Sequence, residues 1–275
     1  MSGARGRRVR WGQNFLADPS VARRIVEWAR PQGRSVLEIG PGRGALTELL
    51  LERCAHLTLV EIDPELARCW RERAATLERL DVVEADALEV DFAEVITPPT
   101  LVVANLPYEA GTAILMRLLE HRGLFDEIVV MLQKEVCERV AATEGGKAYG
   151  LLAIHTRIRA DVERGFRVAP GSFTPPPKVD SQMLRIVPLP GLRHAVGDLD
   201  VFTWLLREAF GQRRKMLRNT VGAMLDARLG PTRGASLLDR AGIAAEDRPE
   251  VVSVERFAAL AALTSAELGP DAGAA

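Results

Sequence analysis

The sequence predicts an α/β fold, in which a mostly parallel sheet is covered by helices, followed by a small all-helical domain. Short apolar runs alternate with helical periodicity along the first part of the chain, as in repeated βαβ units. After Pro188 only helical periodicity remains, with Phe202 and Leu205 on one expected face. We therefore expect one domain over residues 1–190 and a helical domain over residues 191–275.

Capping residues and apolar runs mark the elements of the first domain. Asp18-Pro19 and Asp63-Pro64 each combine a helix N-cap with proline at the first helical position. The second of these helices is expected to end near residue 79. The expected strands cover residues 35–39, 57–62, 81–85, 101–106 and 128–132. Ligands of such sheets bind at the carboxyl ends of the strands, so candidate site residues are sought directly after each one.

Charge is unevenly distributed along a chain whose formal net charge is only −1. Residues 1–30 carry seven arginines against two acids, whereas residues 38–95 carry fourteen acids against six arginines. Residues 207–218 are basic again. Basic ends around an acidic middle favour a polyanionic partner together with a cationic ligand, although ordinary solvated faces would give the same pattern.

Cysteine usage and hydropathy argue against several classes of protein. Cys54, Cys69 and Cys137 are far apart and form no C-x-x-C pair, which favours a reducing compartment over a disulfide framework or a zinc site. Apolar runs stay below the ~18 residues that span a bilayer. The arginine-rich start lacks the apolar segment of a secretory signal. We expect a cytoplasmic protein with no metal and no membrane partner.

A glycine-rich turn and two acids predict a nucleoside-binding site. Gly40, Gly42 and Gly44 follow the first strand of the sheet, where glycine allows a sharp turn and a close approach to a ligand. Such a turn could also serve only to pack a helix. Glu61 ends the next strand, where a carboxylate can accept hydrogen bonds from ribose hydroxyls, and Asp86 follows the third strand, where it can accept from an adenine amino group.

Two kinds of nucleoside cofactor could be predicted for this site. A nicotinamide dinucleotide would favour Gly-x-Gly-x-x-Gly, whereas here the third glycine comes one residue early. Glu38, before the turn, also places negative charge where a pyrophosphate would lie. A cationic sulfonium cofactor is therefore favoured.

A four-residue motif ends the fourth expected strand of the sheet. It reads Asn105-Leu106-Pro107-Tyr108 and resembles the motif of N6-adenine methyltransferases. Residues 12–16 (Gly-Gln-Asn-Phe-Leu) and 36–42 narrow the resemblance to the rRNA adenine dimethyltransferases. Further segments are similar to the small-subunit (KsgA) branch of that family, namely residues 173–181, 213–219 and 248–250.

The motif suits the chemistry of an exocyclic amine. The N6 lone pair of adenine is delocalised into the ring, so the amine is a poor nucleophile. The side-chain oxygen of Asn105 and the carbonyl of Leu106 can accept its two N–H groups and aim the lone pair at a methyl group, while Pro107 fixes the backbone. Stacking on Tyr108 and Phe173 would offset the few kcal/mol that extrusion of the base costs.

The resemblance implies a Rossmann-like S-adenosylmethionine methyltransferase sheet with a helical RNA-recognition domain. It also implies dimethylation of N6 of two adjacent adenosines in the 3′-terminal hairpin loop of 16S rRNA, within the immature small ribosomal subunit, by a protein that is monomeric when free. Cofactor contacts are implied at Asn14, Leu16, Gly40, Gly42, Glu61, Ile62, Asp86, Ala87 and Asn105. RNA contacts are implied at Arg7, Arg8, Arg10, Lys178, Arg213, Arg214, Lys215 and Arg218.

One segment departs from the family pattern. Residues 109–113 read Glu-Ala-Gly-Thr-Ala where Asn-Ile-Ser-Thr-Pro is usual, so Glu109 adds a negative charge beside the target pocket.

Three other functions share part of this sequence pattern. An Erm-type methylase of 23S rRNA shares the fold and the Gln-Asn-Phe-Leu segment, but the Arg-Pro-Glu segment and an expected Arg-Arg-Lys helix favour the small-subunit branch. A non-catalytic ribosome assembly factor would need only the basic ends, whereas the motif and both acids are intact. A DNA adenine methylase usually has two prolines before the tyrosine, and this chain has one.

Overall fold

The computed structural model describes residues 14–269, so the predicted RNA contacts of Arg7, Arg8 and Arg10 lie outside the described residues. The chain divides into two compact units. The first unit runs to Cys137 and resumes over Asp161–Pro190, and the second takes Glu138–Ala160 and continues from Gly191. The expected boundary at residue 190 assigns Glu138–Ala160 to the first domain, whereas its contacts group it with the helical unit.

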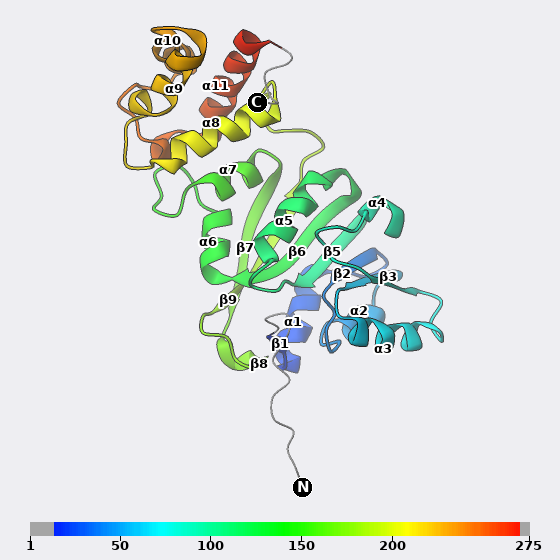
Figure 1. Ribbon diagram of the computed structural model, residues 1–275. Coiled ribbons are helices and arrows are strands. Elements are labelled where there is room, and N and C mark those ends of the chain that lie inside the picture. Colours follow the sequence, from blue (N-terminus) through cyan, green and yellow to red (C-terminus); the bar gives the residue numbers. More distant parts are fainter. Residues whose placement is uncertain (1–13, 270–275) are drawn as a thin grey trace. The chain divides into compact units, whose positions relative to one another are not determined.

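Seven strands form the central sheet of the first unit, in the order β4-β3-β2-β5-β6-β9-β7 (Figure 1). Their bounds are β2 (Ser35–Ile39), β3 (His56–Glu61), β4 (Leu80–Glu84), β5 (Thr100–Asn105), β6 (Phe125–Gln133), β7 (Ala160–Val168) and β9 (Ser181–Pro188). The pairs from β4 to β6 are parallel, and β9 is antiparallel to β6. Because β3 and β5 flank β2 on opposite sides, the carboxyl ends of β2 and β5 form a topological switch point, where ligands bind in such sheets.

The five parallel strands confirm the predicted α/β class, whereas β7 and β9 were not predicted. Charged residues interrupt the apolar pattern of both strands. In β9 the buried Arg185 forms an ion pair with Glu127 and donates to the backbone carbonyl of Trp28. These partners lie far away in the sequence. A second, two-stranded sheet pairs β1 (Phe15–Leu16) with β8 (Phe173–Thr174).

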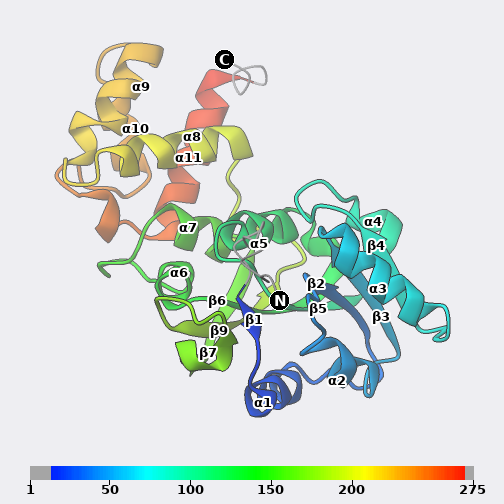
Figure 2. The same ribbon diagram turned by 60° about the horizontal axis from the view of Figure 1, so that its bottom comes forward.

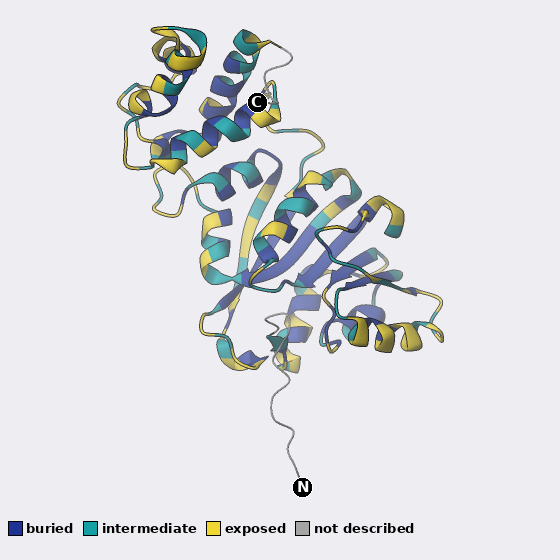
Figure 3. Cartoon of the chain, in the orientation of Figure 1, coloured by how far each residue is buried: buried dark blue, intermediate teal, exposed yellow. Residues whose placement is uncertain are grey.

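Helices cover both faces of the central sheet, and Figure 2 shows α1 and α2 on the face opposite α5. One apolar cluster joins α1 (Pro19–Ala29), α2 (Thr47–Leu51) and α3 (Pro64–Ala74) to one face of the sheet. The remaining helices of this part of the chain are α4 (Phe92–Val95), α5 (Gly111–Glu120) and α6 (Lys134–Val140). The central strands are buried along most of their length (Figure 3).

Both predicted helix caps are present. The Asp18 carboxylate accepts from the N–H of Ser20 at 2.8 Å, and the Asp63 carboxylate accepts from the N–H of Glu65 at 2.9 Å. The prolines that follow begin α1 and α3. However, α3 ends at Ala74, several residues before its expected end.

The second unit packs helices around its own apolar core. Its helices are α7 (Leu151–Arg157), α8 (Leu199–Gly211), α9 (Val221–Leu229), α10 (Arg233–Arg240) and α11 (Val254–Leu268). Buried residues of α7, including Ala153 and Ile154, belong to this core, which explains why the α7 segment groups with the second unit. In the described residues after Pro188 there is no strand, as predicted. None of the helices in residues 14–269 has the length and apolar character that a bilayer crossing needs.

Candidate active site

The carboxyl ends of strands β2 to β5 border a cavity of about 420 Å³, here called the strand-end cavity. Its volume lies within the range of roughly 300–1,000 Å³ that is usual for small-molecule sites. All the residues predicted to contact a cofactor line it, from Asn14 to Asn105, and so do Leu106, Pro107 and Tyr108. The fold therefore brings together the segments that the sequence had suggested separately.

The glycine turn after β2 is held on two sides. Gly42 has a φ of +56° and its N–H donates to Glu61 Oε2 at 3.1 Å, while its carbonyl accepts from Trp70 Nε1 at 3.0 Å. Gly44 has a φ of +85°, and a Cβ added there would lie 2.6 Å from ring carbons of Trp70. Only glycine fits this position, because a side chain would meet both backbone strain and the indole ring.

Glu61 links the turn to the end of β3. Its side chain is buried, and its second oxygen accepts from the N–H of Asp63 at 3.0 Å. Burial raises the pKa of this carboxyl, while the two backbone donors at Gly42 and Asp63 oppose the shift. Each carboxylate oxygen has two lone pairs, so Glu61 keeps capacity to accept from the hydroxyls of a ligand.

Glu38 is a second buried acid in the cavity wall. It is 2% exposed, and its Oε2 has no hydrogen-bond partner among the described residues. Burial, with a smaller contribution from the nearby negative charge of Glu61, raises the pKa of Glu38 to about 8. Buried polar atoms without a partner are uncommon in folded proteins and are candidates for contact with a ligand. The carboxyl oxygens of this wall can accept hydrogen bonds, so the wall suits a cationic or hydroxyl-rich ligand.

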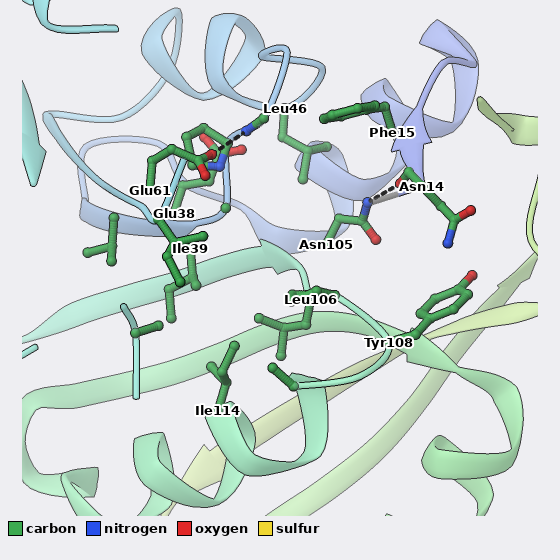
Figure 4. Close-up of a pocket in the computed structure, with 18 of the residues that line it drawn as sticks. Asn14, Phe15, Glu38, Ile39, Leu46, Glu61, Asn105, Leu106, Tyr108 and Ile114 are labelled. Carbon is green, nitrogen blue, oxygen red and sulfur yellow. Dashed lines mark hydrogen bonds between the residues drawn. The ribbon is translucent and has the colours of Figure 1, made fainter. Parts of the chain in front are cut away.

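Asn105 and Tyr108 lie at the other side of the cavity (Figure 4). The Asn105 Nδ2 donates to the carbonyl of Asn14 at 3.4 Å, and Figure 4 shows the Oδ1 turned to the side of Tyr108. The Pro107 carbonyl accepts from the N–H of Gly111 at 2.7 Å, which ties the motif to the start of α5. The amide oxygen is therefore presented beside an aromatic ring.

The hydroxyl of Tyr108 lies 2.6 Å from Ser181 Oγ, which is fully buried at the start of β9. Burial raises the pKa of the Tyr108 phenol, and the hydrogen bond with Ser181 opposes that shift. This contact was not predicted from sequence.

Phe173 is not among the residues that line the cavity. It is 3% exposed, pairs with Leu16 across the small sheet, and packs in the apolar core of the first unit. The described conformation gives no support to the predicted stacking of a base on Phe173. The segment over residues 173–181 instead reaches the site through Ser181.

The expected Arg-Arg-Lys helix is wrong, because α8 ends at Gly211 and residues 212–216 are not helical. Arg213, Arg214 and Lys215 lie in this turn, and Arg218 lies in the short 3-10 helix Leu217–Asn219. Arg213 pairs with Glu250 at 3.3 Å, and Arg218 pairs with Glu246 at 2.9 Å. Arg214 and Lys215 are exposed and form no ion pair within residues 14–269. In the first unit, Lys178 is exposed in the loop before β9.

Several cavity residues were not identified from sequence. The apolar side chains of Phe15, Leu46, Leu88 and Ile114 line it, and the Arg43 guanidinium lies 4.6 Å from the centre of the Phe15 ring. Apolar residues in a cavity wall have the same sequence pattern as core residues, so no local signal separates them.

Comparison with known proteins identifies similar sequences and folds. A family model described as "Ribosomal RNA adenine dimethylase" matches residues 5–264. "Ribosomal RNA small subunit methyltransferase A" of Geobacter sulfurreducens is 44% identical over 256 residues, covering 90% of this chain and 92% of the relative. The protein of the same name from Pseudomonas putida is 41% identical over 257 residues, covering 92% and 93%.

Two solved structures are similar over most of the chain. A dimethyladenosine transferase from Plasmodium falciparum has a TM-score of 0.77 and 26% identity, covering 90% of this chain and 95% of its own. The 23S rRNA methyltransferase ErmE has a TM-score of 0.65 and 28% identity, covering 90% and 98%.

The glycine turn gives a prediction about stability. Gly44→Ala should lower the free energy of unfolding by about 1–3 kcal/mol, because the added methyl group overpacks against Trp70. Chemical denaturation measures this change. Gly123→Ala is the matched control, since Gly123 is exposed and a Cβ there has no atom within 4 Å. Equal stability of the two variants would contradict the tight fit.

The elevated pKa of Glu38 gives a prediction about pH. The folded chain holds this proton up to about pH 8, whereas the unfolded chain releases it near the ordinary glutamate pKa of 4.5. This group therefore makes the protein less stable as pH rises between these values, by at most about 1.4 kcal/mol per pH unit. Glu38→Gln removes the effect, so its melting temperature should exceed that of the unmodified protein at pH 8 more than at pH 5. The matched control is Glu52→Gln, at an exposed glutamate that does not line the cavity.

Proposed function

The chain belongs to the ribosomal RNA adenine dimethylase family, and from this premise we propose that it dimethylates N6 of two adjacent adenosines in the 3′-terminal hairpin loop of 16S rRNA. The methyl donor is S-adenosylmethionine. One observation carries the proposal: a single cavity combines an acidic cradle for a cationic nucleoside with Asn105 and Tyr108, which suit an adenine amine.

The strand-end cavity has the chemistry that the cofactor requires. S-adenosylmethionine, when bound, supplies an electrophilic methyl group on a positively charged sulfur. Glu61 would accept from the ribose hydroxyls, and Asp86, whose Oδ1 already accepts from the N–H of Leu88 at 2.8 Å, would accept from the adenine amino group. The unpartnered Oε2 of Glu38 lies in the same wall, and a bound cation would favour the ionised form of this carboxyl.

Methyl transfer then depends on how the target amine is held. The Oδ1 of Asn105 and the backbone carbonyl of Leu106 accept the two N–H groups, so the nitrogen lone pair is directed at the methyl group. No general base is needed, because the nitrogen becomes strongly acidic as it gains the methyl. The main catalytic contribution is positioning, which can supply about 7–11 kcal/mol. Tyr108 offers a face on which the extruded base can stack.

Similarity to relatives supports the small subunit as the substrate. Relatives named for the small subunit are 41% and 44% identical, compared with 28% for the 23S rRNA methyltransferase. We further propose that the enzyme acts as a monomer on immature small subunits in the cytoplasm. The turn over residues 212–216, here called the basic turn, supports an RNA partner, because Arg214 and Lys215 are exposed there and can contact RNA phosphates.

The decisive experiment incubates the protein with S-adenosylmethionine and either immature small ribosomal subunits, which contain 16S rRNA, or 23S rRNA. Primer extension and mass spectrometry of the digested nucleosides should detect N6,N6-dimethyladenosine in 16S rRNA alone. Asn105→Ala should lower kcat by about 10²–10³-fold, as is typical when one oriented polar contact to the transition state is lost. RNA binding should remain unchanged. Modification confined to 23S rRNA would reassign the substrate, and normal turnover by the variant would disprove the role of Asn105.

The basic turn gives a prediction about salt. Each phosphate contact contributes about 0.7–0.9 to the slope of log affinity against log salt concentration. Replacing both Arg214 and Lys215 with Ala should therefore lower the slope by roughly 1.4–1.8. Fluorescence anisotropy with a labelled 16S fragment measures it. The control is Arg240→Ala, because Arg240 is paired with Glu267 at 3.0 Å. A slope equal to that of the unmodified protein would remove this turn from the RNA interface.

A further inference from the structure

We propose that Ser181 positions Tyr108: its buried hydroxyl holds the phenol end of the tyrosine and thereby fixes the face on which the target base stacks. The inference rests on the proposed function, since it concerns the same site. It assigns a role to the last residue of the segment over residues 173–181, which was not among the residues predicted to contact the cofactor or the RNA.

The contact joins a loop to a rigid part of the sheet. Tyr108 lies between β5 and α5, and its hydroxyl is 2.6 Å from Ser181 Oγ. Ser181 is the first residue of β9, is fully buried, and pairs with Gln133 of β6. Next to it, the N–H of Lys134 donates to the carbonyl of Asp180 at 2.9 Å. The backbone that carries the Ser181 hydroxyl is therefore fixed by its pairing with the end of β6.

Holding the far end of the ring determines its orientation. A tyrosine side chain turns about two bonds, Cα–Cβ and Cβ–Cγ. A fixed contact at the hydroxyl restricts the first, because that rotation moves the oxygen. The second rotation leaves the oxygen in place, but a phenol O–H prefers the plane of its ring, so the direction of the hydrogen bond to Ser181 favours one ring plane. Stacking depends on the direction of the ring plane, and small errors in the placement of a reacting base lower the rate steeply. Phe173 cannot share this task in the described conformation, because it lies in the core. Of the two residues predicted to stack on the base, Tyr108 lines the cavity and Phe173 does not, and Ser181 is the support of Tyr108.

The chain contains two tyrosines, which makes the contact directly observable. Tyr149 belongs to the second unit, where its hydroxyl donates to the carbonyl of Val252 at 3.0 Å. Protein labelled with ¹³C at tyrosine Cζ should give one NMR signal for each ring, assigned with Tyr108→Phe. Ser181→Ala should shift the Tyr108 signal and leave the Tyr149 signal in place.

Kinetics separate positioning from simple packing. Ser181→Ala should lower kcat on 16S rRNA by roughly two- to tenfold, as expected for the loss of one neutral hydrogen bond, without changing the Kd of S-adenosylmethionine. Tyr108→Phe keeps the ring and removes the hydroxyl, so it should have a similar effect. The double variant should be no slower than the slower single variant, because both changes remove the same interaction. Ser172→Ala, at another buried serine of the first unit, is the matched control and should change neither the rate nor the signal.

The outcomes distinguish the two proposals. An unshifted Tyr108 signal in Ser181→Ala, or rate losses that add in the double variant, would overturn the positioning role. Unmodified protein that binds S-adenosylmethionine and leaves 16S rRNA unmethylated would instead overturn the proposed function, while the NMR test would still report on the contact.

Discussion

One buried carboxylate organises the site. Glu61 ends β3 and accepts the N–H of Gly42 from the turn after β2 and the N–H of Asp63 from the start of the next helix. Taking an ionised carboxylate out of water costs several kcal/mol, and hydrogen bonds to a charged acceptor return about 1.5–3 kcal/mol each. The carboxylate is stable in this position only while the turn keeps its shape. The glycine turn and Glu61 are therefore one structural unit.

The same constraint places negative charge where a cationic ligand can use it. Glu38 and Glu61 are both buried in the wall of one cavity, and burial, with a smaller contribution from the charge of Glu61, raises the pKa of Glu38 to about 8. Glu38 therefore keeps its proton near neutral pH while it has no cationic partner. A protein gains no stability from an acid of this kind that has no partner. The arrangement is reasonable for a site whose ligand carries a positive charge, because the ligand supplies the missing partner. A pyrophosphate in the same place would be repelled.

Local sequence signals predicted the parts of the fold that local interactions determine. The caps at Asp18 and Asp63 depend on neighbours within a few residues, and these predictions are confirmed. The turn at Gly42 follows from the freedom of glycine itself, although its hydrogen bonds come from Glu61 and Trp70 farther along the chain. Strand β9 depends instead on the pairing of Arg185 with Glu127, nearly sixty residues earlier, which no local pattern shows. Most residues predicted to contact a cofactor were found because they lie at or just after a strand end, and Asn14 and Leu16 were found from the family resemblance. The apolar lining of the cavity could not be told from core residues.

The segment over residues 173–181 shows what a resemblance in sequence cannot determine. A motif specifies which residues recur, but only packing decides which of them faces the ligand. Here the aromatic residue of this segment, Phe173, packs in the core, and Ser181, eight positions later, contacts Tyr108 in the loop between β5 and α5. A serine gives no sign of that role in the sequence, since a hydroxyl is equally suited to a strand end or a turn. Its significance comes from complete burial beside Tyr108, because a buried hydroxyl needs a partner and the phenol at 2.6 Å is that partner.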